Sequence, residues 1–483
     1  MVLGLILGVV LFVGKAEGQV DTLTLEASIQ HALKDGPSVV VAREMFAVRR
    51  ARYDSFRSGL LPQMTIQGQA PGYLRSISSI VQPDGSTVFA PQSQANAALD
   101  LSISQRIPWT GGEMSLSSSL SRIDLLESKL TSYRSTPLSL SLRQPLFQLN
   151  TLGWDVEMQE LKMRISERQR DEDLEDVALD VANKFFDAAL AALNMENASK
   201  NVQINDTLYQ ISVGRYNVGK IAENELLQGE LAALNARTQV ANATTAYNRA
   251  RKALSFALGL PKESRLHLVL PAEIPALNLD PDRAVAEAMN NRSDILNRDL
   301  SLATAERSVN EARFSNGFSG TLFLNAGFNQ RAGTIPNAYR HLLDQQQLSI
   351  SFQVPVVQWG VGSSAVEAAL ADQQRSKVAG EIQMNGLQDE VAAQVATLQL
   401  LQSQVGIAAK TEAIAVRRFE VSKDRYMIGK IDVTNLFLAQ SEKDAARRSR
   451  VQTLGEFWTG YYRLRRLTLY DFAADRPIGR RPK

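Results

Sequence analysis

The 483-residue chain contains no cysteine. This absence excludes disulfide bonds, thiolate metal ligands, a cysteine nucleophile and a lipid-modified N-terminal cysteine. Histidine is scarce as well, since only His31, His267 and His341 occur, far apart in the sequence. We expect them on the surface or in linkers rather than around a metal ion. No glycine-rich loop follows a strand and precedes a helix in the way that a phosphate cradle requires. These absences predict a protein without a cofactor or metal, and without enzymatic activity.

An excess of charge of one sign is also missing. The chain has 53 Lys and Arg against 51 Asp and Glu, a net charge of +2. Nucleic acid is therefore a poor candidate partner, because it attracts strongly basic surfaces. Acidic pairs such as Asp171 with Glu175 fall on predicted helices. We interpret them as solvated charges rather than as an acid and a base of a catalytic site.

Long hydrophobic runs are missing after Val13, so the sequence offers no membrane helix, which needs about 18 apolar residues or more. The apolar stretch 1–13 is too short to span a bilayer and is followed by the small residues Ala16 and Gly18. We interpret residues 1–18 as a secretory signal peptide, with a disordered or helical N-terminus as the alternative. A chain of this kind can cross a membrane only as a closed β-barrel, which pairs every strand backbone group within the hydrocarbon.

What the chain does contain is an internal repeat. The stretch Ser212–Ile221 occurs again as Ser422–Ile431, 210 residues later, with Ser, Arg, Tyr, Gly, Lys and Ile identical. The same offset aligns Leu138–Gln148 with Leu348–Gln358. One offset that holds over about ninety residues indicates a duplicated unit. Each copy reads as an alternating strand, a proline-marked corner, a long helix, a Gly-Lys turn and a returning helix.

The repeat predicts the following organisation. Residues 19–260 form the first repeat, with an opening helix kinked at Gly36–Pro37, four strands and a long helical hairpin. A connector of residues 261–281 leads to the second repeat at 282–470, with a helix, two strands and a second hairpin. The tail 471–483 reads as disordered. The predicted strands are 64–69, 97–107, 113–121, 138–147, 321–328 and 348–357, and the predicted hairpins are 154–258 and 364–469.

The strands alternate strictly between apolar and polar residues. Between Leu348 and Val354, every second residue is apolar and the residues between are Ser or Gln. Such strands suit a barrel with a lipid-facing outside and a wet lumen, although a soluble β-sandwich with one solvated face remains an alternative. Trp109 and Trp359 follow prolines at strand ends, which suits an interfacial aromatic belt or ordinary half-buried tryptophans.

The helix predicted from residue 154 to about residue 212 is about 85 Å long at 1.5 Å per residue. A helix of this length needs lateral partners. Its apolar residues form two adjoining seams, which would let it pack against neighbours on both sides, as in a curved wall of helices.

Taken together, these motifs resemble the TolC-like outer-membrane efflux protein family. The resemblance rests on the order and duplication of the motifs, which are Arg-Tyr-x-x-Gly-Lys-Ile at 215–221 and 425–431, Leu-Gly-Leu-Pro at 258–261, Asn-Arg-Ser-Asp at 291–294, and the corners at Pro145 and Pro355. It implies a mixed α and β fold: a homotrimer whose outer-membrane β-barrel continues into a long periplasmic α-helical barrel.

The resemblance also implies a function. The chain would be the outer-membrane channel of a tripartite efflux pump, a passive exit duct for small molecules. It would lie in the cell outer membrane, in contact with its lipid, and extend into the periplasm. Its partners would be a periplasmic adaptor protein and an inner-membrane pump.

The family's functional positions map onto the two Gly-Lys turns at the far tip of the helical barrel. The resemblance implies that the tip is gated by Arg215, Tyr216, Glu225, Arg425, Tyr426 and Asn435, and that the adaptor contacts Gly219, Lys220, Gly429 and Lys430. Family members commonly carry an acidic residue where Asn435 stands here, so we do not expect strong cation selectivity.

A second departure concerns the strands. The first repeat carries one strand pair more than the second. Three chains of six strands would make a barrel of eighteen, wider than is usual in the family; alternatively, the additional hairpin lies outside the barrel wall.

Two other functions stay open at the level of sequence. The same fold could serve as the exit duct of a type I protein secretion system, because the pump, and not the channel, chooses the cargo. From a different class, the chain could be a periplasmic structural coiled-coil protein with soluble β-modules.

Overall fold

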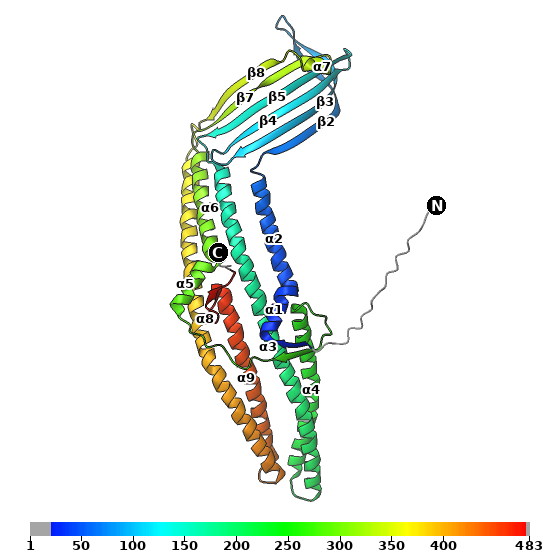
Figure 1. Ribbon diagram of the computed structural model, residues 1–483, viewed down its shortest axis with the longest axis vertical. Helices are drawn as coiled ribbons and strands as arrows, with labels where there is room; N and C mark the ends of the chain where they lie inside the picture. Colours follow the sequence, from blue (N-terminus) through cyan, green and yellow to red (C-terminus); the bar gives the residue numbers. More distant parts are fainter. Residues whose placement is uncertain (1–20, 480–483) are drawn as a thin grey trace, which may run out of the picture. The chain divides into compact units, whose positions relative to one another are not determined.

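The computed structural model describes residues 21–479 (Figure 1). The signal peptide predicted at residues 1–18 lies outside the described residues. The described chain divides into two compact units, and each unit combines segments of both repeats. One unit takes the residues up to Phe46, Glu167–Ser293 and those from Met384 onward; the other takes Ala47–Ser166 and Asp294–Gln383.

The second of these units contains one antiparallel sheet of six strands. Its strands are β2 (Gln63–Val81), β3 (Thr87–Ile107), β4 (Gly112–Leu125), β5 (Leu130–Leu146), β7 (Ser319–Ala332) and β8 (Leu343–Gln353). They pair in the order β2-β3-β4-β5-β7-β8, and the sheet is twisted and curved (Figure 1). The additional pair β3 and β4 is therefore part of the sheet, which argues against a hairpin outside it.

Several strands are longer than alternation alone predicted. Most of residues 71–93, which lie between the predicted strands 64–69 and 97–107, extend β2 and β3, and these two strands pair as far as Val81 with Thr87. The backbone groups of the two strands form hydrogen bonds with each other along this stretch, where Arg75 lies opposite Ser93. Three register shifts, between Gln69 and Gly72, Ser117 and Ser119, and Ser135 and Leu138, add local bends to the strands.

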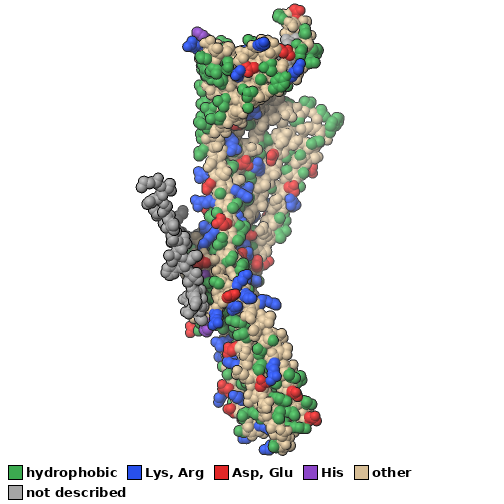
Figure 2. Space-filling view, turned by 90° about the vertical axis from the view of Figure 1, so that its right-hand side faces the viewer, with side chains coloured by type: hydrophobic (Ala, Val, Ile, Leu, Met, Phe, Trp, Pro, Cys, Tyr) green, Lys and Arg blue, Asp and Glu red, His purple; other side chains and the backbone are tan. Residues whose placement is uncertain are grey.

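The sheet has one apolar and one polar face. Side chains directly paired across four neighbouring strands form an apolar row: Met114, Leu142, Leu324 and Leu348. The next row, on the opposite face, is polar: Ser115, Ser141, Asn325 and Gln347. Asn325 Nδ2 donates to Ser141 Oγ at 2.7 Å. Much of the apolar face is exposed, with Leu348 at 68%, and Figure 2 shows apolar side chains gathered over the sheet.

The tryptophans at the strand ends are also exposed. Trp109 lies in the turn between β3 and β4 with 81% of its surface accessible, and Trp359 follows β8 with 94% accessible. Neither is half-buried in the chain, so the second interpretation of these residues is wrong.

The other helices and strands are as follows: β1 (Asp21–Thr24), α1 (Leu25–Asp35), α2 (Pro37–Ser58), α3 (Thr151–Asn217), α4 (Glu223–Ala257), β6 (Leu266–Val269), α5 (Pro281–Asn291), α6 (Ser293–Ser315), α7 (Ile335–Ala338), α8 (Val361–Met427), α9 (Val433–Thr468), β9 (Tyr470–Asp471) and β10 (Arg476–Pro477). α3 and α8 each run for 67 residues without a break. None of the described helices combines the length and the hydropathy of a membrane span.

The first unit, which contains Glu167–Ser293, is stabilised by a large apolar core. Phe185 on α3, Leu398 on α8 and Phe457 on α9 are fully buried in it, together with α1, α5 and the pair of short parallel strands β1 and β6. Alanines such as Ala178 and Ala182 on the buried side of α3 let neighbouring helices approach closely. Burial of the seam, rather than helix propensity, stabilises a helix of this length.

Of the tail predicted to be disordered at 471–483, the described residues 471–479 are folded. β9 and β10 form a short antiparallel pair. Tyr470 Oη donates to Asp475 at 2.8 Å and accepts from Arg283 Nη2 at 2.6 Å. The hydrogen bonds from Tyr470 and Arg283 lower the pKa of Asp475, so this carboxylate stays ionised and fastens the tail to α5.

Candidate functional site: the helical tips

The two helical hairpins, α3–α4 and α8–α9, end in the same turn. Gly219 and Gly429 adopt φ angles of 71° and 75°, in the left-handed region where glycine alone is unstrained. Lys220 N donates to Arg215 O at 2.9 Å, and Lys430 N donates to Arg425 O at the same distance. These bonds close the last helical turn and leave both lysine side chains exposed at the tip.

Arg215 and Tyr426 join the two hairpins. Arg215 Nη2 donates to the backbone oxygen of Tyr426 at 3.2 Å, and its guanidinium lies over the Tyr426 ring, 4.8 Å from the centroid. Tyr426 is only 3% exposed and packs with Leu208 of α3 and with Val433 and Leu436 of α9. The structure thus brings together one predicted gating residue from each repeat.

The equivalent contact, between Arg425 and Tyr216, is not formed within the described chain. Tyr216 is 40% exposed, although it is the counterpart of the buried Tyr426. Arg425, the counterpart of Arg215, is exposed as well. Glu225 is half-buried in the first turn of α4, and Asn435 is exposed in the first turn of α9.

Asn435 contributes to the N-terminal cap of its own helix, α9. Its backbone nitrogen and its Nδ2 both donate to Asp432 Oδ1, at 2.8 and 2.9 Å. Asp432 is the N-cap of α9, whereas Ala222 in the equivalent place before α4 makes no side-chain cap. The two tips therefore share their turn but differ in how the returning helix begins.

An open groove of about 760 Å³ runs beside α8 near its tip. This α8 groove is lined by Ala413, Ile414, Arg417, Arg418, Val421, Ser422, Arg425, Ile431 and Asn435. It combines an apolar floor with three arginines. Ile414, on that floor, is 70% exposed.

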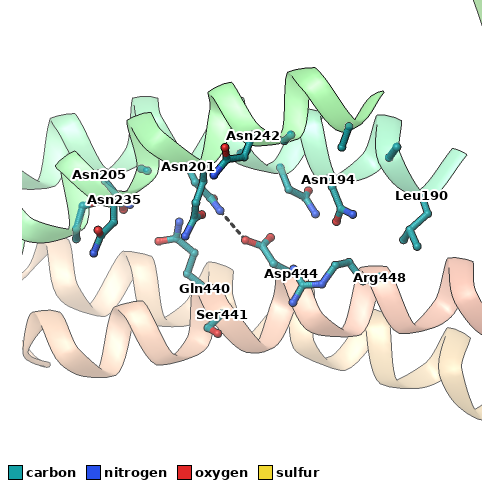
Figure 3. A pocket seen from close by; sticks show the side chains of 18 of the residues that line it. Leu190, Asn194, Asn201, Asn205, Asn235, Asn242, Gln440, Ser441, Asp444 and Arg448 are labelled. Atoms are coloured by element: carbon teal, nitrogen blue, oxygen red, sulfur yellow. Dashed lines mark hydrogen bonds between the residues drawn. The ribbon is translucent and has the colours of Figure 1, made fainter. Parts of the chain in front are cut away.

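A second, larger groove of about 800 Å³ lies farther from the tip, between α3, α4 and α9 (Figure 3). Eight of its lining residues carry amide side chains, and Asn201 Nδ2 donates to Asp444 Oδ2 at 2.7 Å. Several buried polar atoms there have no hydrogen-bond partner among the described protein atoms: Asn197 Nδ2, Asn201 Oδ1, Asn205 Oδ1 and Gln440 Oε1. Since buried amide atoms need partners, this amide groove is suited to water or to a polar ligand.

The amide groove was not predicted from the sequence. A signal was present, because Asn194, Asn197, Asn201 and Asn205 recur at helical spacing on α3. Over residues 21–479, no group of His, Cys, Asp and Glu side chains is placed to hold a metal ion.

We compared the chain with known protein families and solved structures. Residues 88–260 match the family model described as Outer membrane efflux protein. The match agrees with the TolC-like resemblance of the sequence. The search of curated protein sequences gave no match.

Solved structures of outer membrane channels share the fold over nearly the whole chain. The Campylobacter jejuni CmeC outer membrane channel aligns with a TM-score of 0.67 and 15% identity, over 92% of this chain and 85% of that one. The outer membrane protein VceC from Vibrio cholerae aligns at 0.63 and 13%, over 93% and 96%. The open state of the Neisseria gonorrhoeae MtrE outer membrane channel aligns at 0.61 and 16%, over 92% and 88%. The described chain thus has the TolC-like channel fold.

Proposed function

We propose that the chain is the outer-membrane channel of a tripartite efflux pump, a passive exit duct for small molecules. Three copies close their sheets into one β-barrel in the outer membrane, and their helical hairpins form a duct that extends into the periplasm. A periplasmic adaptor protein contacts the tips, and an inner-membrane pump supplies the energy. The match of residues 88–260 to the outer membrane efflux protein model and the TolC-like fold support this assignment.

The observation that carries the proposal is the sheet with one exposed apolar face. An apolar row that includes Leu324 and Leu348 is directly paired across neighbouring strands, while the opposite face carries Ser141 and Asn325. An exposed apolar surface of this extent is costly in water and favourable against lipid. Among the described strands of this sheet, β2 and β8 are each paired on one side only, so they can pair with further copies.

The exposed residues at the strand ends fit the same assignment. Trp109 and Trp359 lie where strands end, the level at which aromatic side chains favour a membrane–water interface. The exposed Lys220 and Lys430, which flank the glycine turns, would face the adaptor.

The test uses two arginine substitutions on neighbouring positions of β8. Leu348→Arg places a charge on the apolar face, and we expect it to cost about 2–4 kcal/mol if that face lies in the bilayer core. Ser349→Arg, the matched control, places the same charge on the polar face and should be tolerated. Both variants and the wild type are expressed with their leader, and outer-membrane fractions are assayed for heat-modifiable oligomers and for conductance in planar bilayers.

We expect Leu348→Arg to reduce the membrane-inserted oligomer severalfold and Ser349→Arg to leave it unchanged. Equal effects of the two substitutions would contradict a lipid-facing sheet. A wild-type protein that is monomeric and free of lipid would overturn the proposed function as a whole.

A further inference from the structure

The amide groove holds buried polar side chains whose hydrogen bonds are incomplete. Asn197 is 4% exposed, Gln440 5% and Asn205 8%, and each has a polar atom without a hydrogen-bond partner among the described protein atoms. All residues that line the groove belong to the first unit. Since buried amide atoms that lack partners destabilise the folded chain, these atoms require a ligand or water.

The hydrogen bonds already made determine which atom of each amide is unpartnered. Arginine can only donate, so Asn197 accepts from Arg447 Nη1 with its Oδ1, at 3.0 Å, and its unpartnered Nδ2 is a donor. A carbonyl can only accept, so Asn205 donates to Ala232 O with its Nδ2, at 3.4 Å, and its unpartnered Oδ1 is an acceptor. The same reasoning applies to Asn201, whose Nδ2 donates to a carboxylate and whose unpartnered Oδ1 is an acceptor. Hydroxyl groups, which both donate and accept, complement such a mixed set.

The formal charges at the amide groove balance. Its charged lining residues are Asp187, Asp444 and Arg448. Lys443 Nζ lies 3.3 Å from Asp444 Oδ1 and supplies a second positive charge. Two acids are thus matched by two bases, and no net charge remains to attract an ion. An uncharged ligand therefore suits the groove better than a metal ion, an ammonium group or a phosphate.

The amide groove is long and has a mixed lining. Its volume of about 800 Å³ is that of a small-molecule site, and it continues between α3 and α4 into a second hollow of about 450 Å³, with which it shares Asp187, Asn242 and Ala246. Amides recur along it every three or four residues, on α3 at Asn194, Asn197, Asn201 and Asn205 and on α4 at Asn235, Gln239 and Asn242. The α3 row is about 16 Å long at 1.5 Å per residue. Small apolar residues lie between the amides: Ala191, Ala198, Ala232, Ala236, Ala243 and Ala246.

Such a lining suits a molecule with hydroxyl groups along its edges and C–H groups on its faces, as in a short chain of sugar rings. Hydroxyls can donate to the oxygens of Asn201 and Gln440 and accept from Asn197, while the C–H faces lie against the alanines. Figure 3 shows the amides of α3 and α4 opposite Gln440 and Asp444 of α9, so a ligand in the groove would contact all three helices.

We infer that the amide groove is a binding site for an uncharged, polyhydroxylated ligand of the neutral oligosaccharide class. The ligand lies along α3 and α4, and Gln440 of α9 contacts it from the opposite wall. The site is formed within one chain and does not depend on the proposed channel, so it can be tested independently of that proposal.

The test is calorimetric titration of the purified full chain with glucose, maltose and maltotriose. The detergent must lack a sugar headgroup, because an alkyl maltoside would compete for the groove. We expect binding at about millimolar concentration for the smallest probe, and affinity that rises with each added ring because the groove is long. A second series compares sorbitol with N-methylglucamine and gluconate, which carry a positive and a negative charge at neutral pH. We expect neither charged probe to bind more tightly than sorbitol.

Two substitutions remove amides from different walls of the groove. Gln440→Leu removes a buried, unpartnered oxygen, and Asn242→Ala removes an exposed amide that cannot be needed for a packed core. Each should weaken maltotriose binding about twofold to tenfold, as the loss of one or two neutral hydrogen bonds does. The matched control is Asn248→Ala, an exposed position of the same helix α4 outside the groove, which should bind as wild type. Circular dichroism confirms that each variant is folded.

Weaker binding in either groove variant, with the control unchanged, supports the inference. Absence of maltotriose binding to the folded wild type, or equal affinities of both groove variants and the wild type, would overturn it and assign the groove to water. A preference of about tenfold or more for a charged probe over sorbitol would overturn it as well, because the groove would then recognise charge. None of these outcomes bears on the proposed channel, which the Leu348→Arg experiment tests separately.

Discussion

Arg215, one of the residues proposed to gate the tip, joins the two hairpins through its contacts with Tyr426. It holds Tyr426 through a cation–π contact and through a hydrogen bond to the backbone oxygen. A cation–π contact of this kind contributes about 0.5–2 kcal/mol. The contact links the first hairpin to the second, so a tip that opens by separating the hairpins must break it.

We predict that Arg215→Ala raises the open fraction of the proposed channel roughly twofold to thirtyfold, the change that about 0.5–2 kcal/mol produces. The measurement is single-channel recording in planar bilayers at fixed salt. Tyr426→Phe is the matched control, because it keeps both the ring and the backbone oxygen that Arg215 contacts, and it should record as wild type. Identical open fractions for Arg215→Ala and the wild type would show that this contact does not hold the tip closed.

The same residues show what could and could not be predicted from the sequence. The duplicated Arg-Tyr and Gly-Lys positions identify both tips and their turns, because a left-handed residue at Gly219 and Gly429 is a local requirement. The difference between Tyr216 and Tyr426 could not be predicted, since both occur in the same motif. It arises from tertiary structure, because within the described chain only the contact between Arg215 and Tyr426 is formed.

At the scale of the element, the helices were more predictable than the strands. Amphipathic seams and the Gly-Pro and Gly-Lys breaks delimit the helices, and these are local signals. The polar half of the β2–β3 hairpin has no apolar alternation, and its strand structure comes from pairing with its neighbour. The tail from Tyr470 to Pro477 was missed for the same reason, because Arg283, its anchor, lies nearly two hundred residues away.

The two returning helices offer a matched experiment on helix capping. Asp432 caps α9 by accepting from Asn435 N, whereas Ala222 leaves α4 without a side-chain cap. Replacing a good N-cap by alanine costs about 0.5–2 kcal/mol. We therefore predict that Ala222→Asp stabilises the first tip, and that Asp432→Ala destabilises the second, by similar amounts.

The measurement is amide hydrogen exchange of the tip segments 216–230 and 426–440. Protection of the first segment should rise in Ala222→Asp and that of the second should fall in Asp432→Ala, each by about twofold to thirtyfold. The segment that is not substituted serves as the internal control in each variant. A change in Asp432→Ala without the opposite change in Ala222→Asp would indicate that the tips differ in more than their caps.

At the scale of the whole molecule, the six-stranded sheet determines the size of the proposed barrel. Strands lie about 4.8 Å apart and tilt by about 40° in closed barrels. Three chains with the strand order β2-β3-β4-β5-β7-β8 supply eighteen strands. The barrel wall should then be about 36 Å across between backbones, whereas four strands from each chain would give about 24 Å.

The strand pair β3 and β4 can be removed to test this relation. Deleting residues 82–125 leaves β2 joined to β5 by the turn at 126–129, and an up-and-down connection is preserved because two antiparallel strands are lost together. We predict a barrel of about 36 Å for the wild type and about 24 Å for the deletion variant in electron microscopy of the purified oligomers viewed along the barrel axis. The helical part should keep its width in both, because no residue of α3, α4, α8 or α9 is changed. Equal barrel widths would mean that β3 and β4 leave the wall on assembly, and the open edges of the six-stranded sheet would then have to pair in another order.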